Sequence, residues 1–368
     1  MSGSSPLRVL VLFGGRSAEH EISCLSARNV VDALDPDRYR VTTVGITRDG
    51  RWTLSEVPEP KPGTLPRVSD DADSVMLAGT PKGPRLLRLP EDGPAAEIGP
   101  VDVCFPVLHG PYGEDGTVQG LLASMGVPYV GADVGSSAVG MDKVRMKRLF
   151  GVSGLPQTAY ETIDRVDFER DPGRALDTVE AALPYPIFSK PARQGSSIGI
   201  SRCGDRGSLA AGITEALEHD RVVVLERGLT AARELECGVL GNVDVEVTPP
   251  GEVITGHDFY DFEGKYLDDA VTLMCPAEVD DAVRRRCSGY ARQAYEAIGA
   301  RGMARVDFFY VEDTGEVLVN EINTIPGFTE GSMFPRAWAA EGLDNGRLVD
   351  RLLELALAAA ETDARFAP

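Results

Sequence analysis

An alternation of strand and helix patterns in the first third of the chain restricts its fold more than any other feature. The apolar run 7–15, LRVLVLFGG, predicts a buried strand, and residues 17–34 predict a helix that ends at DPD. Residues 39–47 and 101–110 predict two further strands. Because strand, helix and strand follow one another, we expect a parallel sheet whose functional loops lie at the carboxyl ends of its strands.

The rest of the chain predicts smaller elements. Residues 56–100 are rich in Pro, Gly and Asp and have weak periodicity, which predicts an inserted peripheral segment that is partly mobile. Residues 136–156 predict one helix that ends at Gly-Leu-Pro. The other expected elements are strands at 185–190, 198–203, 221–227, 234–241 and 244–250, and helices at 173–183, 209–219, about 279–298 and about 344–360.

The composition argues against several classes of protein. The chain has 368 residues, of which 43% are apolar, and this is enough for the cores of roughly two or three domains. A formal net charge of −20 and the lack of a long basic run argue against nucleic-acid binding. The longest apolar stretches have the length of strands, and the N-terminus has no secretion pattern, so we expect a cytoplasmic protein with no membrane contact.

The cysteines and histidines give no metal-binding pattern. Six cysteines without a CxxC pair predict six buried thiols, and a zinc site or a disulfide framework is not expected. The four histidines have no metal-ligand spacing between them.

Polar side chains occupy one face of a predicted hairpin near the end of the chain. Glu321 and Asn323 in NEINTIPGFTEGSMFP are two residues apart, as are Arg305 and Asp307 in ARVDFFYV, so each pair points to one face of its strand. A three-residue loop, 313–315 with a left-handed glycine, places Asp307 opposite Glu321, whereas a loop with an even number of residues separates them. These oxygen ligands suit Mg²⁺ and predict a metal–phosphate site; the alternative is a solvated edge hairpin.

Two loops carry groups suited to phosphate or ammonium. In SKPARQGSSIG, 189–199, backbone N–H groups can surround phosphate oxygens while Lys190 supplies a positive charge. The loop is not a Walker motif, and the alternative is a flexible hairpin. GGRSAEHEIS, 14–23, does not match a dinucleotide fingerprint. Its alternatives are a helix capped by Ser17 and a Glu19 carboxylate that binds a ligand ammonium group.

Two further segments are candidates for a ligand site. LHGPYGEDGTVQG, 108–120, places His109 at the carboxyl end of the third strand, where open α/β sheets bind ligands, although a single histidine is commonly structural. DFEGKYLDD, 261–269, has no amphipathic order. It predicts either a lid over a reactive intermediate or an ordinary surface loop.

Seven motifs, in order, resemble those of the D-alanine–D-alanine ligase family of the ATP-grasp superfamily. They are GGRSAEHEIS, LHGPYGEDGTVQG, MDKVRMK, SKPARQGSSIG, YDFEGKY, ARVDFFY and NEINTIPGFTEGSMFP. The resemblance extends from about residue 8 to about residue 355 and is weakest in 56–100. It implies an α/β fold with α+β character in its nucleotide-binding part. This is the ATP-grasp fold, in which an N-terminal parallel-sheet βαβ domain precedes two domains that clamp ATP. The implied domains are 1–131, 132–230, and 231–368 with a lid at about 257–276.

The resemblance also implies an activity. Such an enzyme joins two D-alanine molecules through an acyl phosphate, releases ADP and phosphate, and supplies D-alanyl-D-alanine for peptidoglycan precursors. The implied cofactors are ATP and two Mg²⁺ ions, with Mn²⁺ as a substitute, and the implied assembly is a homodimer. The alternatives are a ligase that uses D-lactate or D-serine, another ATP-grasp carboxylate–amine ligase, and a nucleotide-responsive binding protein without turnover.

Individual residues receive roles from this resemblance. The catalytic residues are Glu19, Ser196, Tyr266, Arg305, Gly327 and Ser332, and the metal ligands are Asp307, Glu321 and Asn323. The nucleotide contacts are Lys143, Lys190, Ser197, Glu226, Gly228, Leu229, Glu234, Phe259, Lys265 and Phe309. The substrate contacts are Glu19, His109, Arg305, Gly327, Ser332 and Met333. The chain departs from the family pattern in two places. Asn320 stands where an apolar residue could line the adenine pocket. The segment TAARELEC is slightly long, so Glu234 and Glu236 are alternatives for the residue that binds the ribose.

Overall fold

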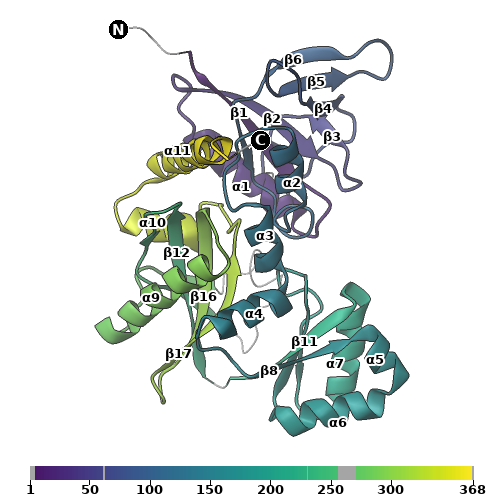
Figure 1. Ribbon diagram of the computed structural model, residues 1–368, viewed down its shortest axis with the longest axis vertical. Coiled ribbons are helices and arrows are strands. Elements are labelled where there is room, and N and C mark those ends of the chain that lie inside the picture. The colour runs from purple at the N-terminus through teal and green to yellow at the C-terminus, as the bar shows by residue number, and fades with distance from the viewer. Residues whose placement is uncertain (1–4, 61–62, 230, 256–270, 367–368) are drawn as a thin grey trace.

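The computed structural model describes residues 5–60, 63–229, 231–255 and 271–366, and three β-sheets occur in these ranges (Figure 1). The N-terminal sheet has the strand order β6-β5-β4-β3-β2-β1-β7. Its strands are β1 Leu7–Gly14, β2 Tyr39–Ile46, β3 Trp52–Leu54, β4 Ser74–Ala78, β5 Arg85–Leu89, β6 Ala96–Pro100 and β7 Val103–Pro106. Helix α1 (His20–Ala33) connects β1 to β2, and β1 lies parallel to both β2 and β7. The predicted parallel βαβ unit is therefore confirmed.

Strand β1 is buried on both faces. Val9, Val11 and Phe13 enter a core that also contains residues of the C-terminal helix, whereas Leu10 and Leu12 enter a second core on the opposite face. Burial on both faces explains why this strand is a continuous apolar run and not an alternating one.

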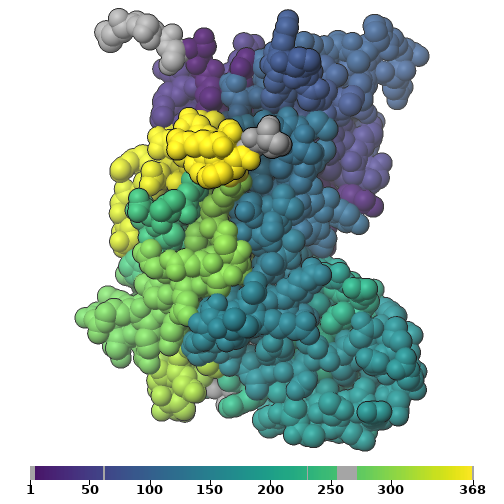
Figure 2. Space-filling view, in the orientation of Figure 1, coloured from purple at the N-terminus to yellow at the C-terminus, as the bar shows by residue number. Residues whose placement is uncertain are grey.

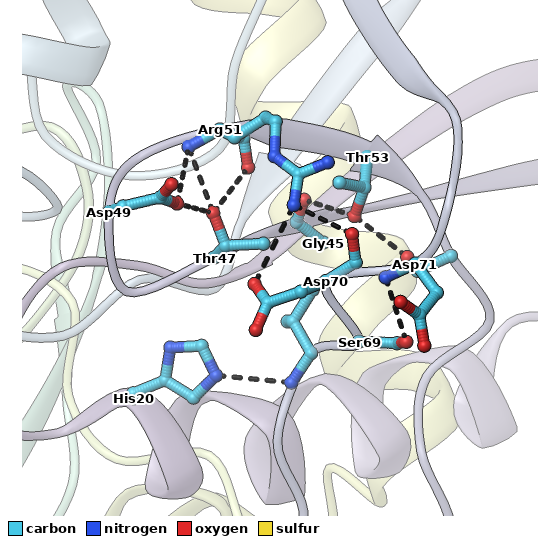
Figure 3. Close-up of polar contacts among 11 residues, drawn as sticks. His20, Gly45, Thr47, Asp49, Arg51, Thr53, Ser69, Asp70 and Asp71 are labelled. Carbon is cyan, nitrogen blue, oxygen red and sulfur yellow. Dashed lines mark hydrogen bonds and ion pairs between the residues drawn. The ribbon is translucent and has the colours of Figure 1, made fainter.

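The segment 56–100 is peripheral, as expected, but it forms strands that were not predicted. β4, β5 and β6 extend the sheet in antiparallel pairs, and β6, at the edge, is mostly exposed, so its side chains give no apolar alternation. Figure 3 shows how the chain before β4 is anchored. The Arg51 guanidinium donates to the backbone oxygen of Asp70 at 2.7 Å. His20 Nε2 accepts from the N–H of Val68 at 3.1 Å.

The single helix predicted at 136–156 is two helices, α3 (Val134–Met141) and α4 (Lys143–Val152). They meet at Asp142, whose backbone is extended and whose carboxylate accepts two N–H groups of the next turn at 3.1 Å each. An aspartate in this position is an N-cap, so a second helix starts directly after it. The break places Lys143 in the first turn of α4.

The middle of the chain forms a small antiparallel sheet with the order β10-β9-β11-β8. Its strands are β8 Tyr160–Asp164, β9 Ile187–Pro191, β10 Ser201–Cys203 and β11 Val222–Arg227. Helices α5 Arg165–Arg170, α6 Pro172–Ala182 and α7 Arg206–His219 pack beside this sheet. The earlier helix α2 Thr117–Ser124 instead packs against the N-terminal sheet through Val118 and Leu122. Apolar residues of α6, α7 and the strands form one core.

The third sheet is also antiparallel, with the order β15-β14-β12-β16-β17 and β13 paired to β12. Its strands are β12 Ala232–Gly241, β13 Glu246–Val247, β14 Gly251–Thr255, β15 Val271–Met274, β16 Gly302–Val311 and β17 Glu316–Asn323. The accompanying helices are α9 Asp281–Ala297, α10 Met333–Ala340 and α11 Asn345–Ala364.

Helix α11 returns to the N-terminal sheet. Leu348, Leu352 and Leu353 share the core that contains one face of β1, and Asp350 accepts from the Tyr39 hydroxyl at 2.7 Å. Figure 1 shows α11 beside α1, and Figure 2 shows the yellow C-terminal segment packed against the purple and blue N-terminal part. The first and last parts of the chain are therefore joined by a common core.

The cysteines are all free thiols, but one differs from the prediction of six buried side chains. Five are buried, whereas Cys275 is partly exposed because it lies where the chain leaves the edge strand β15. No helix in the described ranges combines the length and the apolar character needed to cross a membrane.

Candidate functional site

One large cavity, of about 740 Å³, lies where the three parts of the chain meet. Its walls come from α1, the loop after β7, the loop between β9 and β10, strands β12, β16 and β17, and the segment that leads into α10. Among the residues predicted to form the site, those that line the cavity are Glu19, His109, Lys143, Ser196, Glu234, Arg305, Asp307, Phe309, Glu321, Asn323, Gly327, Ser332 and Met333.

The hairpin β16–β17 has the predicted pairing but a different loop. Asp307 lies opposite Glu321, as expected. The loop, however, has four residues, 312–315, between the paired residues Val311 and Glu316, and an even loop alone would separate the two carboxylates. A β-bulge restores the pairing, because Phe308 pairs with Val319 and Asn320 is left as the extra residue.

The bulge also changes which side chains face the cavity. Val319 and Ile322 are buried in the core on the other side of the sheet, and the two residues between them, Asn320 and Glu321, both line the cavity. A regular strand would expose only one of the two.

Positive charges balance the paired carboxylates. Arg305 binds both oxygens of Asp307, Nε to Oδ1 and Nη2 to Oδ2, each at 2.7 Å, and it also lies 3.0 Å from Glu236 Oε2. Burial lowers the pKa of Arg305, but Asp307 and Glu236 outweigh that effect and hold it well above its ordinary value. Lys143 Nζ lies 3.2 Å from Glu321 Oε2. Each carboxylate therefore lies beside a cation, Asp307 beside an arginine and Glu321 beside a lysine.

Behind this cluster, a buried carboxylate joins two lysines. Lys190 Nζ lies 2.9 Å from Glu226 Oε2, and Lys147 Nζ lies 3.1 Å from Glu226 Oε1. Burial raises the pKa of Glu226, but the two ammonium groups lower it to about 2. Lys147 was not predicted from the sequence, although its spacing of four residues from Lys143 in MDKVRMK places both on one helix face.

Glu19 and Ser196 meet across the cavity. The Ser196 hydroxyl donates to Glu19 Oε1, which joins the start of α1 to the loop between β9 and β10. A Cβ atom at Gly110 would lie 2.6 Å from Glu19 Oε2, and one at Gly195 would lie 3.1 Å from it. The carboxylate therefore needs glycine on both sides.

Ser17 does not cap α1, contrary to one of the two alternatives for GGRSAEHEIS. The helix begins at His20 with Glu19 as its N-cap residue. The Ser17 hydroxyl instead donates to the backbone oxygen of His109 at 2.7 Å and accepts from the Glu19 N–H at 3.2 Å. Ser17 thus ties the strand ends of β1 and β7 together and orients the Glu19 backbone.

His109 lines the cavity, but both of its ring nitrogens are bound to protein atoms. Nδ1 lies 3.1 Å from the backbone oxygen of Ile325, and Nε2 lies 3.0 Å from Ser26 Oγ. Because a carbonyl oxygen only accepts, Nδ1 carries the proton and Nε2 accepts from the Ser26 hydroxyl. Burial lowers the pKa of His109, which favours this neutral form. These contacts support the structural alternative for His109.

Ser26 continues this network to the backbone of the loop after β17. Its oxygen accepts from the N–H of Phe328 at 3.2 Å, and Asn29 Nδ2 donates to the oxygen of the same residue at 2.8 Å. Together with His109, these side chains bind the backbone on both sides of Gly327. Ser26 and Asn29 were missed, because a serine and an asparagine on a predicted helix give no sequence pattern of their own.

We expect Ser26→Ala to leave the Phe328 N–H and His109 Nε2 without their partner in a buried place. The loss is expected to be about 1–3 kcal/mol in the free energy of unfolding. It should also lower kcat/KM by about 10-fold, because the loop around Gly327 loses its fixed position. Thermal unfolding and steady-state kinetics measure the two effects. Ser124→Ala, on the exposed side of α2, is the matched control and should change neither quantity. Unchanged kinetics with lowered stability would remove Ser26 from the positioning of this loop.

Ser332 and Met333 lie at the start of α10. Ser332 is the N-cap residue, but its hydroxyl makes no capping bond and lies 2.8 Å from the Thr329 hydroxyl and 3.1 Å from the N–H of that residue. Helix N-termini present N–H groups that suit anions. A Cβ atom at Gly327 would lie 3.0 Å from Ser332 Oγ, so glycine allows this close approach.

Several predicted nucleotide contacts do not line the cavity. Lys190 and Glu226 lie behind the cavity. Ser197 lies in the loop between β9 and β10, and Gly228 and Leu229 come directly after β11. The N–H of Gly228 already donates to the backbone oxygen of Pro186 at 2.7 Å. The predicted residues Phe259, Lys265 and Tyr266 and most of the predicted lid lie outside the described residues.

Glu114 is a further cavity residue that the sequence did not single out. It is buried, and its Oε1 accepts from the N–H of Gly110 at 2.8 Å. Burial, together with the charge of Glu19, raises the pKa of Glu114 to about 8. Its position in GPYGEDG, after a strand that ends in the site, is the pattern that could have identified it.

The fold and the site together define a class. One antiparallel sheet with the neighbouring helix α4 carries lysines, the other antiparallel sheet carries paired carboxylates, and both lie beside a domain whose mixed sheet contains a parallel βαβ unit; this is the architecture of an ATP-grasp enzyme.

Comparisons with known proteins agree. Family models described as the D-ala D-ala ligase N-terminus and C-terminus match residues 8–132 and 149–354. The chain is 48% identical over 371 residues to the D-alanine–D-alanine ligase of Kineococcus radiotolerans, with 97% of this chain and 98% of that protein covered. It is 47% identical over 368 residues to that of Mycobacterium sp. strain JLS, with 95% and 96% covered.

Two solved structures have the same fold over nearly their whole length. The D-alanine-D-alanine ligase from Coxiella burnetii is 32% identical with a TM-score of 0.82, and the coverage is 99% of this chain and 97% of that one. The VanG D-Ala:D-Ser ligase from Enterococcus faecalis is 34% identical with a TM-score of 0.81, and the coverage is 96% and 100%. The chain belongs to the D-alanine–D-alanine ligase family, whose members are ATP-dependent ligases.

Proposed function

We propose that the protein joins two D-alanine molecules to D-alanyl-D-alanine, with ATP converted to ADP and phosphate, for peptidoglycan precursor synthesis. The observation that carries this proposal is the composition of the large cavity. The carboxylate of Glu19, which suits an ammonium group, lies in the same cavity as the pair Asp307 and Glu321, which suits a metal–phosphate group. Membership of the ligase family supports the same reaction.

The nucleotide is proposed to bind between the two antiparallel sheets. Lys143 and Lys190 reach its phosphates, and Lys265 joins them from the lid. Glu226, Gly228 and Leu229 lie on the adenine side, with Ser197, Phe259 and Phe309 completing the nucleotide contacts. Glu234 is assigned to the ribose, because it lines the cavity two residues before Glu236 on β12, and Glu236 is bound to Arg305.

The metal ligands Asp307, Glu321 and Asn323 fit Mg²⁺. All three offer oxygen, the two carboxylates face each other on adjacent strands, and Asn323 Nδ2 lies 3.3 Å from Asp307 Oδ2. We propose that phosphate oxygens of the nucleotide complete the ligand set. We propose two ions, with Mn²⁺ as a substitute; when bound, they offset the phosphate charge during transfer.

The chain's own groups position the substrates. The carboxylate of the first D-alanine takes the γ-phosphoryl group from ATP, which turns a poor electrophile into an acyl phosphate. Glu19 holds the ammonium group of this first D-alanine. The second D-alanine loses a proton from its ammonium group, and its amine attacks the acyl carbon; the bond from that carbon to the phosphate oxygen breaks and phosphate leaves. Arg305 and the N–H of Gly327 stabilise the oxyanion. Ser332 and the N–H of Met333 hold the carboxylate of the second D-alanine.

Other parts of the proposal concern closure and assembly. Tyr266 joins Glu19 and Ser196 in a hydrogen-bonded set that closes the lid over the intermediate and excludes water. The domains are 1–131, 132–230 and 231–368. We further propose a homodimer that works in the cytoplasm, where ATP and the amino-acid substrate are present.

A single assay tests the reaction. Phosphate release is measured with ATP and Mg²⁺ and with D-alanine, L-alanine, D-serine or D-lactate. We expect release that requires D-alanine and Mg²⁺, with L-alanine nearly inert, because Glu19 and Arg305 fix groups around one chiral carbon. Equal turnover with L-alanine would contradict the proposal.

The second substrate needs a separate competition, since one similar structure is that of a D-Ala:D-Ser ligase. Labelled D-alanine is offered with D-serine or D-lactate in excess at neutral pH, and the products are separated. We expect D-alanyl-D-alanine as the main product. If either mixed product were the majority, the second substrate would be D-serine or D-lactate, and the ATP-grasp assignment would still hold.

A further inference from the structure

Lys147 has no role in the reaction described above, although it is a buried cation next to the nucleotide-binding residues. Its side chain is 1% exposed, and its Nζ lies 3.1 Å from Glu226 Oε1. The other oxygen of that carboxylate is bound by Lys190 at 2.9 Å. Two ammonium groups therefore share one carboxylate, and each holds a different oxygen.

The position of Lys147 is fixed from several sides. It lies one turn after Lys143 on α4, and its backbone oxygen accepts from Gln157 Nε2 at 3.0 Å. Its Nζ lies 5.5 Å from the centre of the Tyr160 ring, and Tyr160 is paired with Glu226 between β8 and β11. The ammonium group can reach the carboxylate but has little other freedom.

The pair of Lys147 and Glu226 is not fully satisfied by hydrogen bonds. Both Lys147 Nζ and Glu226 Oε1 are buried without a hydrogen-bond partner among the described residues, although they lie within ion-pair distance. At this distance the Lys147 ammonium group balances the charge of the Glu226 carboxylate without forming a hydrogen bond to it.

Lys190 faces two demands once a nucleotide is bound. Its proposed role is to hold a phosphate, yet its ammonium group is bound to Glu226. If Glu226 depended on Lys190 alone, a movement of Lys190 toward the phosphates would leave a buried carboxylate without a counter-charge, which is strongly unfavourable.

We propose that Lys147 is a positioning residue that keeps Glu226 neutralised and so releases Lys190 to bind the phosphates of the nucleotide. The inference rests on the proposed function of Lys190. It predicts that Lys147 affects binding of the phosphate part and not of the nucleoside part. The pKa directions agree: burial lowers the pKa of Lys147, and the pKa of Lys190 is raised because Glu226 outweighs the effect of burial.

The test compares the affinities for ATP and adenosine by calorimetry. In Lys147→Met, Lys190 stays bound to Glu226, so the ATP affinity should fall by about 100-fold while adenosine binding changes by less than about 3-fold. The ratio of the two affinities is the readout, because a merely structural role would weaken both ligands together and leave the ratio unchanged.

A second variant restores the ratio. In Lys147→Met with Glu226→Gln, no buried carboxylate holds Lys190, so the ratio of ATP to adenosine affinity should return to within about 3-fold of the original value. The double variant is also expected to fold, because Lys147 and Glu226 are removed together and neither leaves the other as an unpaired buried charge, while the Lys190 cation remains for the phosphates. If Lys147→Met alone does not fold, Lys147→Gln replaces it with the same expected direction. A ratio unchanged in the single variant, or unrestored in the double variant, overturns the proposal.

Two controls separate this inference from the proposed function. Arg148→Met changes an exposed cation next to Lys147 on α4 and should leave the ratio unchanged. Lys190→Met should lower ATP affinity and spare adenosine. If Lys190→Met leaves the ratio unchanged, the phosphate role of Lys190 fails on its own account, whatever the Lys147 variants show.

Discussion

Replacing Glu321 by Gln is expected to abolish ligation while the fold survives. Glu321 lies opposite Asp307, and its Oε2 is 3.2 Å from Lys143 Nζ. Gln keeps the shape but removes the charge that a divalent cation and the lysine both require. We expect phosphate release to fall by at least about 10³-fold, because the charge on the transferred group is no longer offset.

The measurement combines phosphate release with a melting curve and with Mn²⁺ binding, which reports the metal site without turnover. Glu316→Gln, an exposed change at the start of the same strand, is the matched control and should alter none of the three. Near-original activity in Glu321→Gln, with a normal melting curve, would contradict the metal role of this residue.

The pairing of Asp307 with Glu321 was predicted correctly from the sequence but for the wrong reason. The prediction used a three-residue loop, whereas the loop has four residues and a bulge at Asn320 compensates. The bulge is visible in the sequence, because the core-facing residues Val317, Val319 and Ile322 are spaced by two and then by three. Comparison of these spacings with the two-residue period of a regular strand would have revealed the bulge.

Local patterns predicted elements well where the side chains have a clear buried face. The strand β1, the helix α1 and the hairpin β16–β17 have such faces, and the structure contains them. The strands β4 to β6 lie toward the edge of their sheet and bury few side chains, so their periodicity is weak. The break between α3 and α4 depends on one capping aspartate, Asp142, inside a continuous helical pattern.

The candidate site was predicted least well where its residues act through other residues. Glu19 lies in a loop, Glu321 lies near the end of β17, and Asp307 interrupts the apolar strand β16, so each charge stands out in the sequence. Lys147 acts only through Glu226 and lies inside an ordinary helix pattern. This role depends on the contact between α4 and β11, which are far apart in the sequence, and no local sequence pattern predicts that contact.

The second large effect is expected for Arg305→Ala, which should lower kcat by about two to three orders of magnitude and change the KM for ATP much less. Arg305 is the proposed donor to the oxyanion, and its guanidinium is held in place by Asp307 and Glu236. Arg305→Lys keeps a charge but loses the two-pronged bond to Asp307, so an intermediate kcat is expected.

Loss of Arg305 also removes the cation between two carboxylates, since Glu236 and Asp307 are paired across β12 and β16. Their repulsion is expected to lower the melting temperature of Arg305→Ala, and Glu236→Gln added to it should restore that temperature. The double variant should nevertheless keep the low kcat, because a glutamine beside the strand does not replace a donor to the oxyanion. Recovery of kcat together with stability would mean that Arg305 serves only to balance charge. A defect confined to the KM for ATP would instead place Arg305 in nucleotide binding and outside the acyl-transfer step.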